Sequence, residues 1–125
     1  MRRILLLTLA AAVPATSFAA QVGGAQDFLE RAERLKARGP LAFFDTDYGR
    51  LKAEATAVGK SIGDDRIAAE KAGKPILYCS PAPRAQLGSF EFIRGLEAIP
   101  TAERARMTLK DAMLRVLQKK YPCKR

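Results

Sequence analysis

The sequence has no histidine, no tryptophan and only two cysteines among its 125 residues. Histidine is the commonest side chain in metal sites and the usual base in catalytic triads, so its absence removes the most frequent route to both. The chain also lacks a glycine-rich phosphate-binding loop and a Gly-x-Ser-x-Gly turn. We therefore expect no metal, no cofactor and no catalytic residues, and we predict that the protein is not an enzyme.

A long apolar run is absent as well. The stretch Ile4–Val13, which follows Arg2 and Arg3, has ten residues, whereas a membrane-spanning helix needs about 20. Small residues then occupy the −3 and −1 positions of a cleavage site in Ser17-Phe18-Ala19. This pattern is typical of a secretory signal peptide. We predict a signal peptide at residues 1–19, cleavage near Ala19–Ala20, and a single periplasmic or secreted helical domain at residues 20–125 with no transmembrane segment.

The two cysteines are Cys79 and Cys123. In a small exported chain, a cysteine pair most simply forms a structural disulfide. A redox-active pair would be expected as Cys-x-x-Cys, but these cysteines are 44 positions apart. Closing a loop of this size should stabilise the fold by roughly 4 kcal/mol in the chain-entropy model.

Strand signals are nearly absent, because β-branched residues are few and apolar residues do not alternate with polar ones. Apolar residues instead recur at helical spacing, and Gly39-Pro40, Gly73, Pro100 and Pro122 interrupt the pattern. We predict an all-α fold, a small bundle of four to five short helices closed by one disulfide. The expected helices cover residues 27–38, 45–62, 65–72, 89–98 and 102–120.

Two groups of apolar side chains at the edges of these helices are also expected in the core. The first group, just before the second helix, consists of Leu41, Phe43 and Phe44. The second group, on the fourth helix, consists of Phe90, Ile93 and Leu96.

Two acidic pairs are the remaining candidates for chemistry. Asp45-Thr46-Asp47 resembles the start of a calcium loop, but the sixth and twelfth positions, which should be Gly and Glu, are Arg50 and Thr56. Helix capping explains this pair, and also Asp64-Asp65, better than catalysis does.

Positive charge is concentrated at the C-terminus, where residues 101–125 contain eight Lys or Arg and only two acidic residues. One interpretation is a solvated helix face whose last lysines complement the helix dipole. The other is a patch for an acidic protein, or for anionic lipid or polymer of the cell envelope. Export argues against nucleic acid as the partner. A small envelope-associated protein whose basic C-terminal helix binds anionic lipid or polymer is therefore an alternative function.

The C-terminal half resembles a known family. The pattern consists of Cys79-Ser80-Pro81, then Gln86-Leu87, an apolar helix ended by Pro100, an amphipathic helix and the closing Tyr121-Pro122-Cys123. It is similar to the Rap/Tai immunity proteins, which neutralise peptidoglycan amidase effectors delivered by type VI secretion. The N-terminal half lacks the second cysteine pair that many members carry.

The resemblance implies a periplasmic, all-helical inhibitor that blocks an amidase active site by binding it, often as a homodimer. Both cysteines would be structural. The contact loops of the family vary, so the resemblance assigns no partner-binding residues.

Overall fold

The computed structural model describes residues 23–81 and 85–124. Within these ranges the chain forms helices and connecting segments but no strand, so the predicted all-α class is confirmed. The elements in order are α1 (Ala25–Ala37), the 3₁₀ helix η1 (Gly39–Phe44), α2 (Thr46–Lys71), α3 (Ser89–Ala98), α4 (Thr101–Arg104) and α5 (Leu109–Lys120). The expected signal peptide, residues 1–19, lies outside the described residues.

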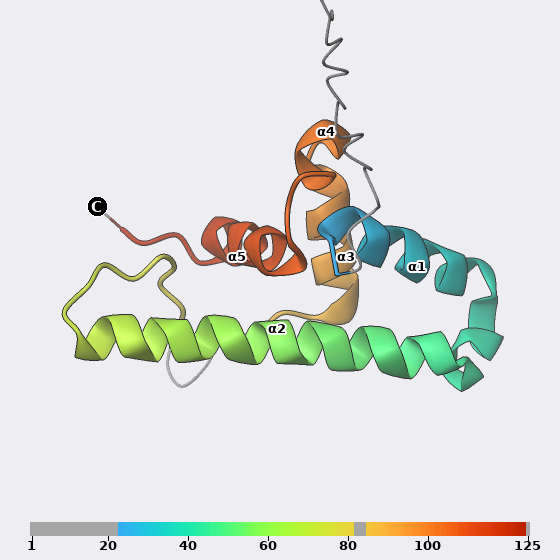
Figure 1. Ribbon diagram of the computed structural model, residues 1–125, viewed down its shortest axis with the longest axis horizontal. Coiled ribbons are helices and arrows are strands. Elements are labelled where there is room, and N and C mark those ends of the chain that lie inside the picture. Colours follow the sequence, from blue (N-terminus) through green and yellow to red (C-terminus); the bar gives the residue numbers. More distant parts are fainter. Residues whose placement is uncertain (1–22, 82–84, 125) are drawn as a thin grey trace, which may run out of the picture.

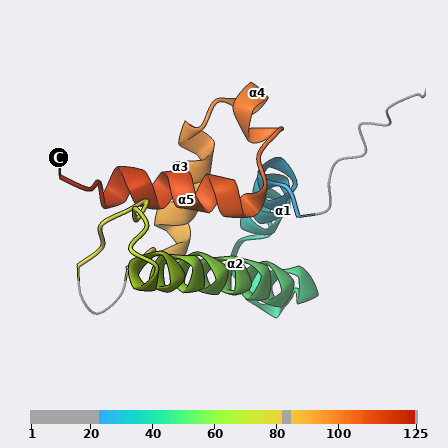
Figure 2. The same ribbon diagram turned by 60° about the vertical axis from the view of Figure 1, so that its left-hand side comes forward.

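Helix α2 forms the base of the molecule, and the other α-helices lie on one side of it (Figures 1 and 2). Helices α1 and α5 pack directly on α2, and α3 crosses above, against both of them. In the core, the rings of Phe28 and Phe92 pack with centroids 5.6 Å apart. Beside them, Leu96 and Leu109 are almost completely buried. The core therefore lies where α1, α3 and α5 meet above α2.

Helix α2 corrects the prediction of two short helices at residues 45–62 and 65–72. It is one helix of 26 residues that continues through Gly59 and Gly63. A glycine costs a helix about 1 kcal/mol relative to alanine, but Leu51 and Ile62 on either side of Gly59 are buried in the core. This burial holds the helix together, so the bundle contains one long helix in place of two short ones.

An ion-pair cluster also joins α1 to α2. Arg31 contacts Asp27 at 2.9 Å on its own helix and Glu54 at 2.7 Å on α2. Desolvation alone would lower the pKa of Arg31. The hydrogen bonds and charges of Glu54 and Asp27 outweigh that effect and raise this pKa above its ordinary value.

The predicted last helix, residues 102–120, is also wrong as a continuous element. It divides into α4 and α5, and Thr108 caps α5 by accepting a hydrogen bond from the Asp111 backbone N–H at 3.0 Å. The connection pairs instead with the start of α1, because the Ala25 N–H donates to the Met107 carbonyl at 3.1 Å. The break places the beginnings of α1 and α5 side by side.

Several predicted core residues lie on the surface. Leu41, Phe43 and Phe44 are exposed, because in the short helix η1 it is Ala42 that packs against the core. Phe90 is exposed too, whereas Leu96 is buried and Ile93 is half-buried as expected.

The inward face of α3 runs instead through Phe92, Leu96 and the following Ile99. Both this face and the predicted one satisfy helical spacing, so the periodicity alone could not choose between them.

Arg104 is the one charged residue among the described residues that is buried in the core. Its guanidinium donates to the carbonyls of Leu96 at 2.8 Å and Ile99 at 2.7 Å, and to Oε1 of Gln26 at 2.6 Å. It therefore satisfies carbonyls at the end of α3 that have no partner within the helix, and it connects them to α1.

Helices α3 and α5 approach closely at Gly95. A Cβ atom built on this residue would lie 2.7 and 2.8 Å from the two methyl carbons of Val116. Val116 is itself buried, so it has little room to move away. The contact therefore depends on glycine at position 95.

We predict that Gly95→Ala lowers the free energy of unfolding by about 1–3 kcal/mol through overpacking against Val116. Gly63→Ala is the matched control, because no atom lies within 4 Å of its added Cβ. That change should stabilise α2 by roughly 0.5–1 kcal/mol. Urea titration followed by circular dichroism measures both. Equal effects of the two substitutions would contradict the close approach, and Val116→Ala should partly rescue Gly95→Ala.

A second prediction concerns the buried guanidinium. Arg104→Ala should cost about 3 kcal/mol, because it leaves the buried Ile99 carbonyl without a donor and removes one of the two donors of the Leu96 carbonyl. Arg106→Ala, at an exposed position two residues away, should change stability by less than about 0.5 kcal/mol. Denaturant midpoints of the two variants test this, and a similar small effect at both positions would argue against the described contacts.

Candidate functional site

The predicted disulfide is present. Cys79 and Cys123 are bonded with their Cα atoms 4.8 Å apart. The bond joins the irregular segment after α2 to the residues that follow α5. It fastens residues 74–81, which form neither helix nor strand, to the end of the last helix.

Two further contacts hold the same stretch at both of its ends. At one end the Cys79 N–H donates to the Tyr121 carbonyl at 2.8 Å. At the other end the Tyr121 hydroxyl donates to the Gln86 carbonyl at 3.0 Å and accepts from the Gln86 N–H at 3.2 Å. We call this set of contacts, from Cys79 and Gln86 to residues 120–123, the C-terminal clamp. It holds Cys79 and Gln86, the two ends of the segment 79–86 that we call the loop, against the residues at the end of α5.

Lys120 completes the clamp. Its ammonium donates to the Gln86 carbonyl at 2.6 Å and lies 2.8 Å from a carboxylate oxygen of Glu91. The hydrogen bond with Glu91 raises the pKa of Lys120 above its ordinary value, against a smaller opposing effect of desolvation. The side chain therefore remains a cation across the neutral pH range.

The segment before the clamp is anchored to α2. Tyr78 is buried, and the guanidinium of Arg66 lies over its ring at 5.1 Å from the centroid. Arg66 also donates a hydrogen bond to the hydroxyl of Ser80. Ser80 thus interacts with a cation, and no base that could activate it for nucleophilic attack contacts it within the described residues.

The first acidic pair has a structural role. The side chain of Asp45 accepts a hydrogen bond from the Asp47 N–H at 2.9 Å, so the predicted capping of α2 is confirmed. Asp45 also pairs with Arg38, and Asp47 lies 3.7 Å from Arg50.

The second acidic pair does not cap a helix, because both residues lie inside α2. There Asp64 pairs with Lys60 at 2.7 Å, and Asp65 pairs with Lys110 of α5 at 2.6 Å. Across residues 23–81 and 85–124, no cluster of three or more Cys, Asp or Glu side chains could hold a metal ion.

The C-terminal cations are less free than the sequence suggests. Arg104 is buried, while Lys110, Arg115 and Lys120 pair with Asp65, Glu103 and Glu91 respectively. Asp65 and Glu91 lie far from their partners in the sequence but close to them in the fold, whereas Glu103 belongs to the same C-terminal region. Among the described residues, the exposed basic side chains of this region without a carboxylate partner are Arg106, Lys119 and Lys124.

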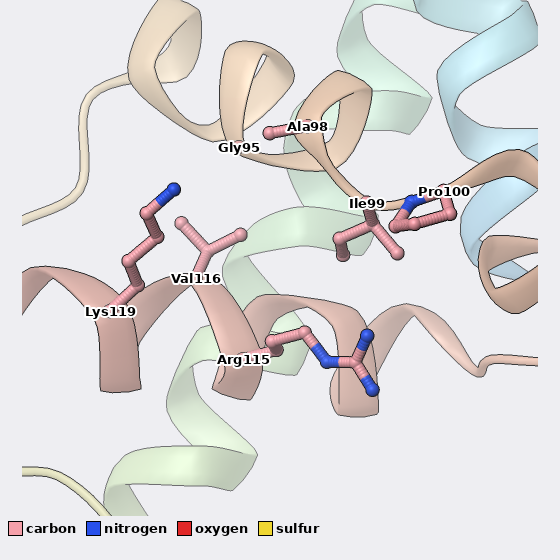
Figure 3. A pocket seen from close by; sticks show the side chains of 7 residues that line it. All are labelled: Gly95, Ala98, Ile99, Pro100, Arg115, Val116 and Lys119. Carbon is pink, nitrogen blue, oxygen red and sulfur yellow. The ribbon is translucent and has the colours of Figure 1, made fainter.

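A small hollow of about 210 Å³ lies between α3 and α5. Figure 3 shows Arg115 and Lys119 on the α5 side, and residues Gly95, Ala98, Ile99 and Pro100 facing them. The lining offers no carboxylate, hydroxyl or thiol. It is also smaller than the roughly 300–1,000 Å³ of typical small-molecule sites. The C-terminal clamp is therefore the better candidate for a functional site.

Sequence reasoning found the two cysteines of the clamp but not its other contacts. Gln86 and Tyr121 were visible only as parts of the family pattern, and nothing local in the sequence pairs them with each other. None of the described helices is both long and apolar enough to span a membrane. In comparisons with known proteins, no family model, no curated protein and no solved structure matches this chain.

Proposed function

We propose that this protein is a non-catalytic inhibitor located in the bacterial periplasm. It would bind a peptidoglycan amidase and cover the active site of that enzyme, as the Rap/Tai immunity proteins do. The observation that carries the proposal is the C-terminal clamp. Four positions of the family-like pattern, Cys79, Gln86, Tyr121 and Cys123, belong to two segments that are distant in the sequence and meet at this one place.

The clamp suits an inhibitor for a physical reason. A loop that is flexible before binding loses conformational entropy when it docks, which weakens the complex. Here the disulfide holds one end of the loop, and hydrogen bonds from Tyr121 and Lys120 hold the other. Cys79 and Gln86 are therefore already held in place before a partner arrives.

The surface of the clamp also suits a protein partner. Ser80, Pro81 and Gln86 are polar or exposed at the base of the loop, and Leu77 beside it is 59% exposed. Polar groups with an exposed apolar side chain nearby match the mixed polar and apolar composition of a protein interface. Binding in this way requires no catalytic group from the inhibitor.

The first test is inhibition of a peptidoglycan amidase effector encoded by the same organism. We expect one equivalent of the protein, isolated from the periplasm, to stop the clearing of a peptidoglycan suspension. The Cys79→Ser/Cys123→Ser variant should lose about 2–4 kcal/mol of stability. It should also inhibit more weakly at a temperature where circular dichroism shows it folded. The proposal fails if the wild-type protein neither binds nor inhibits any amidase of its own genome.

A subtler variant tests the clamp without removing the disulfide. Tyr121→Phe deletes the hydroxyl that bonds both backbone groups of Gln86, and one such bond is worth about 0.5–1.5 kcal/mol. The inhibition constant should therefore rise roughly threefold to tenfold. Tyr48→Phe is the matched control, because Tyr48 lies at the start of α2, outside the clamp. Tyr48→Phe should inhibit as well as the wild-type protein. If both variants raised the inhibition constant equally, inhibition would not depend on the clamp.

A further inference from the structure

The short helix η1 carries an unusual group of exposed apolar side chains. Leu41 is 72% exposed, Phe43 66% and Phe44 88%. The ring of Tyr48, at the start of α2, packs edge-on against Phe43 with centroids 5.3 Å apart. We call these four residues the η1 tip. Single exposed apolar residues are common on soluble proteins, but four within the eight residues 41–48, two of them in ring contact, point to an interaction surface.

The η1 tip lies at one end of the molecule. It joins α1 to the beginning of α2, whereas the C-terminal clamp lies near the far end of α2 (Figures 1 and 2). The tip is therefore separate from the proposed inhibitory surface. Its position at the end of two helices lets it reach a flat surface without interference from the rest of the fold.

The charge around the tip is positive. The two nearest carboxylates are neutralised, since Asp45 pairs with Arg38 and Asp47 with Arg50. Lys36 and Lys52 flank the tip on α1 and α2. Both are exposed, and neither has a carboxylate within 4 Å among the described residues. An apolar group with a cationic rim complements a surface that is apolar inside and anionic outside.

The backbone of the tip also has internal hydrogen bonds, which favour contact with such a surface. It is already coiled as a 3₁₀ helix, and the Asp45 N–H that follows it donates to the Ala42 carbonyl at 3.1 Å. Backbone N–H and C=O groups that hydrogen-bond to each other cost less free energy to move from water into lipid than unbonded groups do. Phenylalanine, tyrosine and leucine are the residue types that enter the interfacial layer of a bilayer most readily.

We propose that the η1 tip inserts into the headgroup region of an anionic lipid bilayer and holds the protein at the membrane surface. Phe43, Phe44 and Leu41 supply the inserted apolar area, while Lys36 and Lys52 contact lipid phosphates. A second copy of the chain fits the tip less well, because a symmetric contact would bring the lysines of both copies together. This inference is independent of the proposed inhibitory function, since it uses the opposite end of α2.

The absence of tryptophan from the chain makes a direct test possible. Phe44→Trp places a single fluorophore on the tip. Its emission should shift to the blue when vesicles of equal parts phosphatidylglycerol and phosphatidylcholine are added, and should not shift with phosphatidylcholine alone. Phe90→Trp is the matched control, because Phe90 is 77% exposed on α3, outside the tip. An unshifted spectrum at position 44, or the same shift at both positions, would overturn the proposal.

Co-sedimentation with the same vesicles measures the strength of binding. Phe43→Ser/Phe44→Ser should reduce the partition coefficient at least about tenfold, as expected for the loss of two inserted rings. Lys36→Glu/Lys52→Glu should reduce it and flatten its dependence on salt. Circular dichroism establishes that each variant is folded.

The control pair for charge is Lys119→Glu/Lys124→Glu at the C-terminus, which should change the partition coefficient by less than about twofold. Loss of binding in this pair alone would assign the lipid surface to the C-terminal region and overturn the role of the tip. Sedimentation equilibrium without vesicles tests the other possible partner of the tip, a second copy of the chain. A wild-type dimer that Phe43→Ser/Phe44→Ser dissociates, combined with no vesicle binding, would identify the tip as a contact between two copies.

Discussion

The covalent bond between Cys79 and Cys123 is the constraint that the rest of the clamp depends on. It fastens Cys79 to the residues that follow α5, and Tyr121 and Lys120 bond Gln86 at the same place. The position of α5 is in turn set by packing elsewhere. Gly95 lets α5 approach α3, and Arg104 holds the end of α3 against α1. The disulfide therefore connects the loop to α5, and the contacts at Gly95 and Arg104 connect α5 and α3 to the rest of the core.

The class of fold and the disulfide could be predicted from the sequence because each rests on a local or compositional signal. Helical spacing needs no knowledge of the tertiary structure, and two cysteines allow only one pairing within the chain. The break between α4 and α5 had no such signal, since Arg104 belongs to a regular helical pattern and is drawn inward by carbonyls of α3. The continuity of α2 through Gly59 likewise depends on the burial of its neighbours, which propensity alone does not contain.

The distribution of surface charge also depends on tertiary contacts that the sequence does not reveal. Counting residues 101–125 indicates a strongly basic element, yet three of its cations are paired, two of them with acids from other parts of the chain. Asp65 lies on α2, Glu91 on α3 and Glu103 on α4. A charge run predicts a patch only when no distant acid folds against it. At the η1 tip the reverse holds. Asp45 and Asp47 pair with Arg38 and Arg50, so the charges of Lys36 and Lys52 are left beside the exposed apolar side chains.

The two proposed surfaces are separated by α2, whose 26 residues correspond to about 39 Å of helix at 1.5 Å per residue. Because this helix is continuous and buried along one side, the distance between them is nearly fixed. A protein held to a bilayer by the η1 tip would carry the clamp away from the lipid, toward the space where peptidoglycan is cut. Neither surface then needs a conformational change to act, and each can be removed by substitutions that leave the other in place. The rigidity of α2 thus gives the two proposals separate experimental consequences within one small fold.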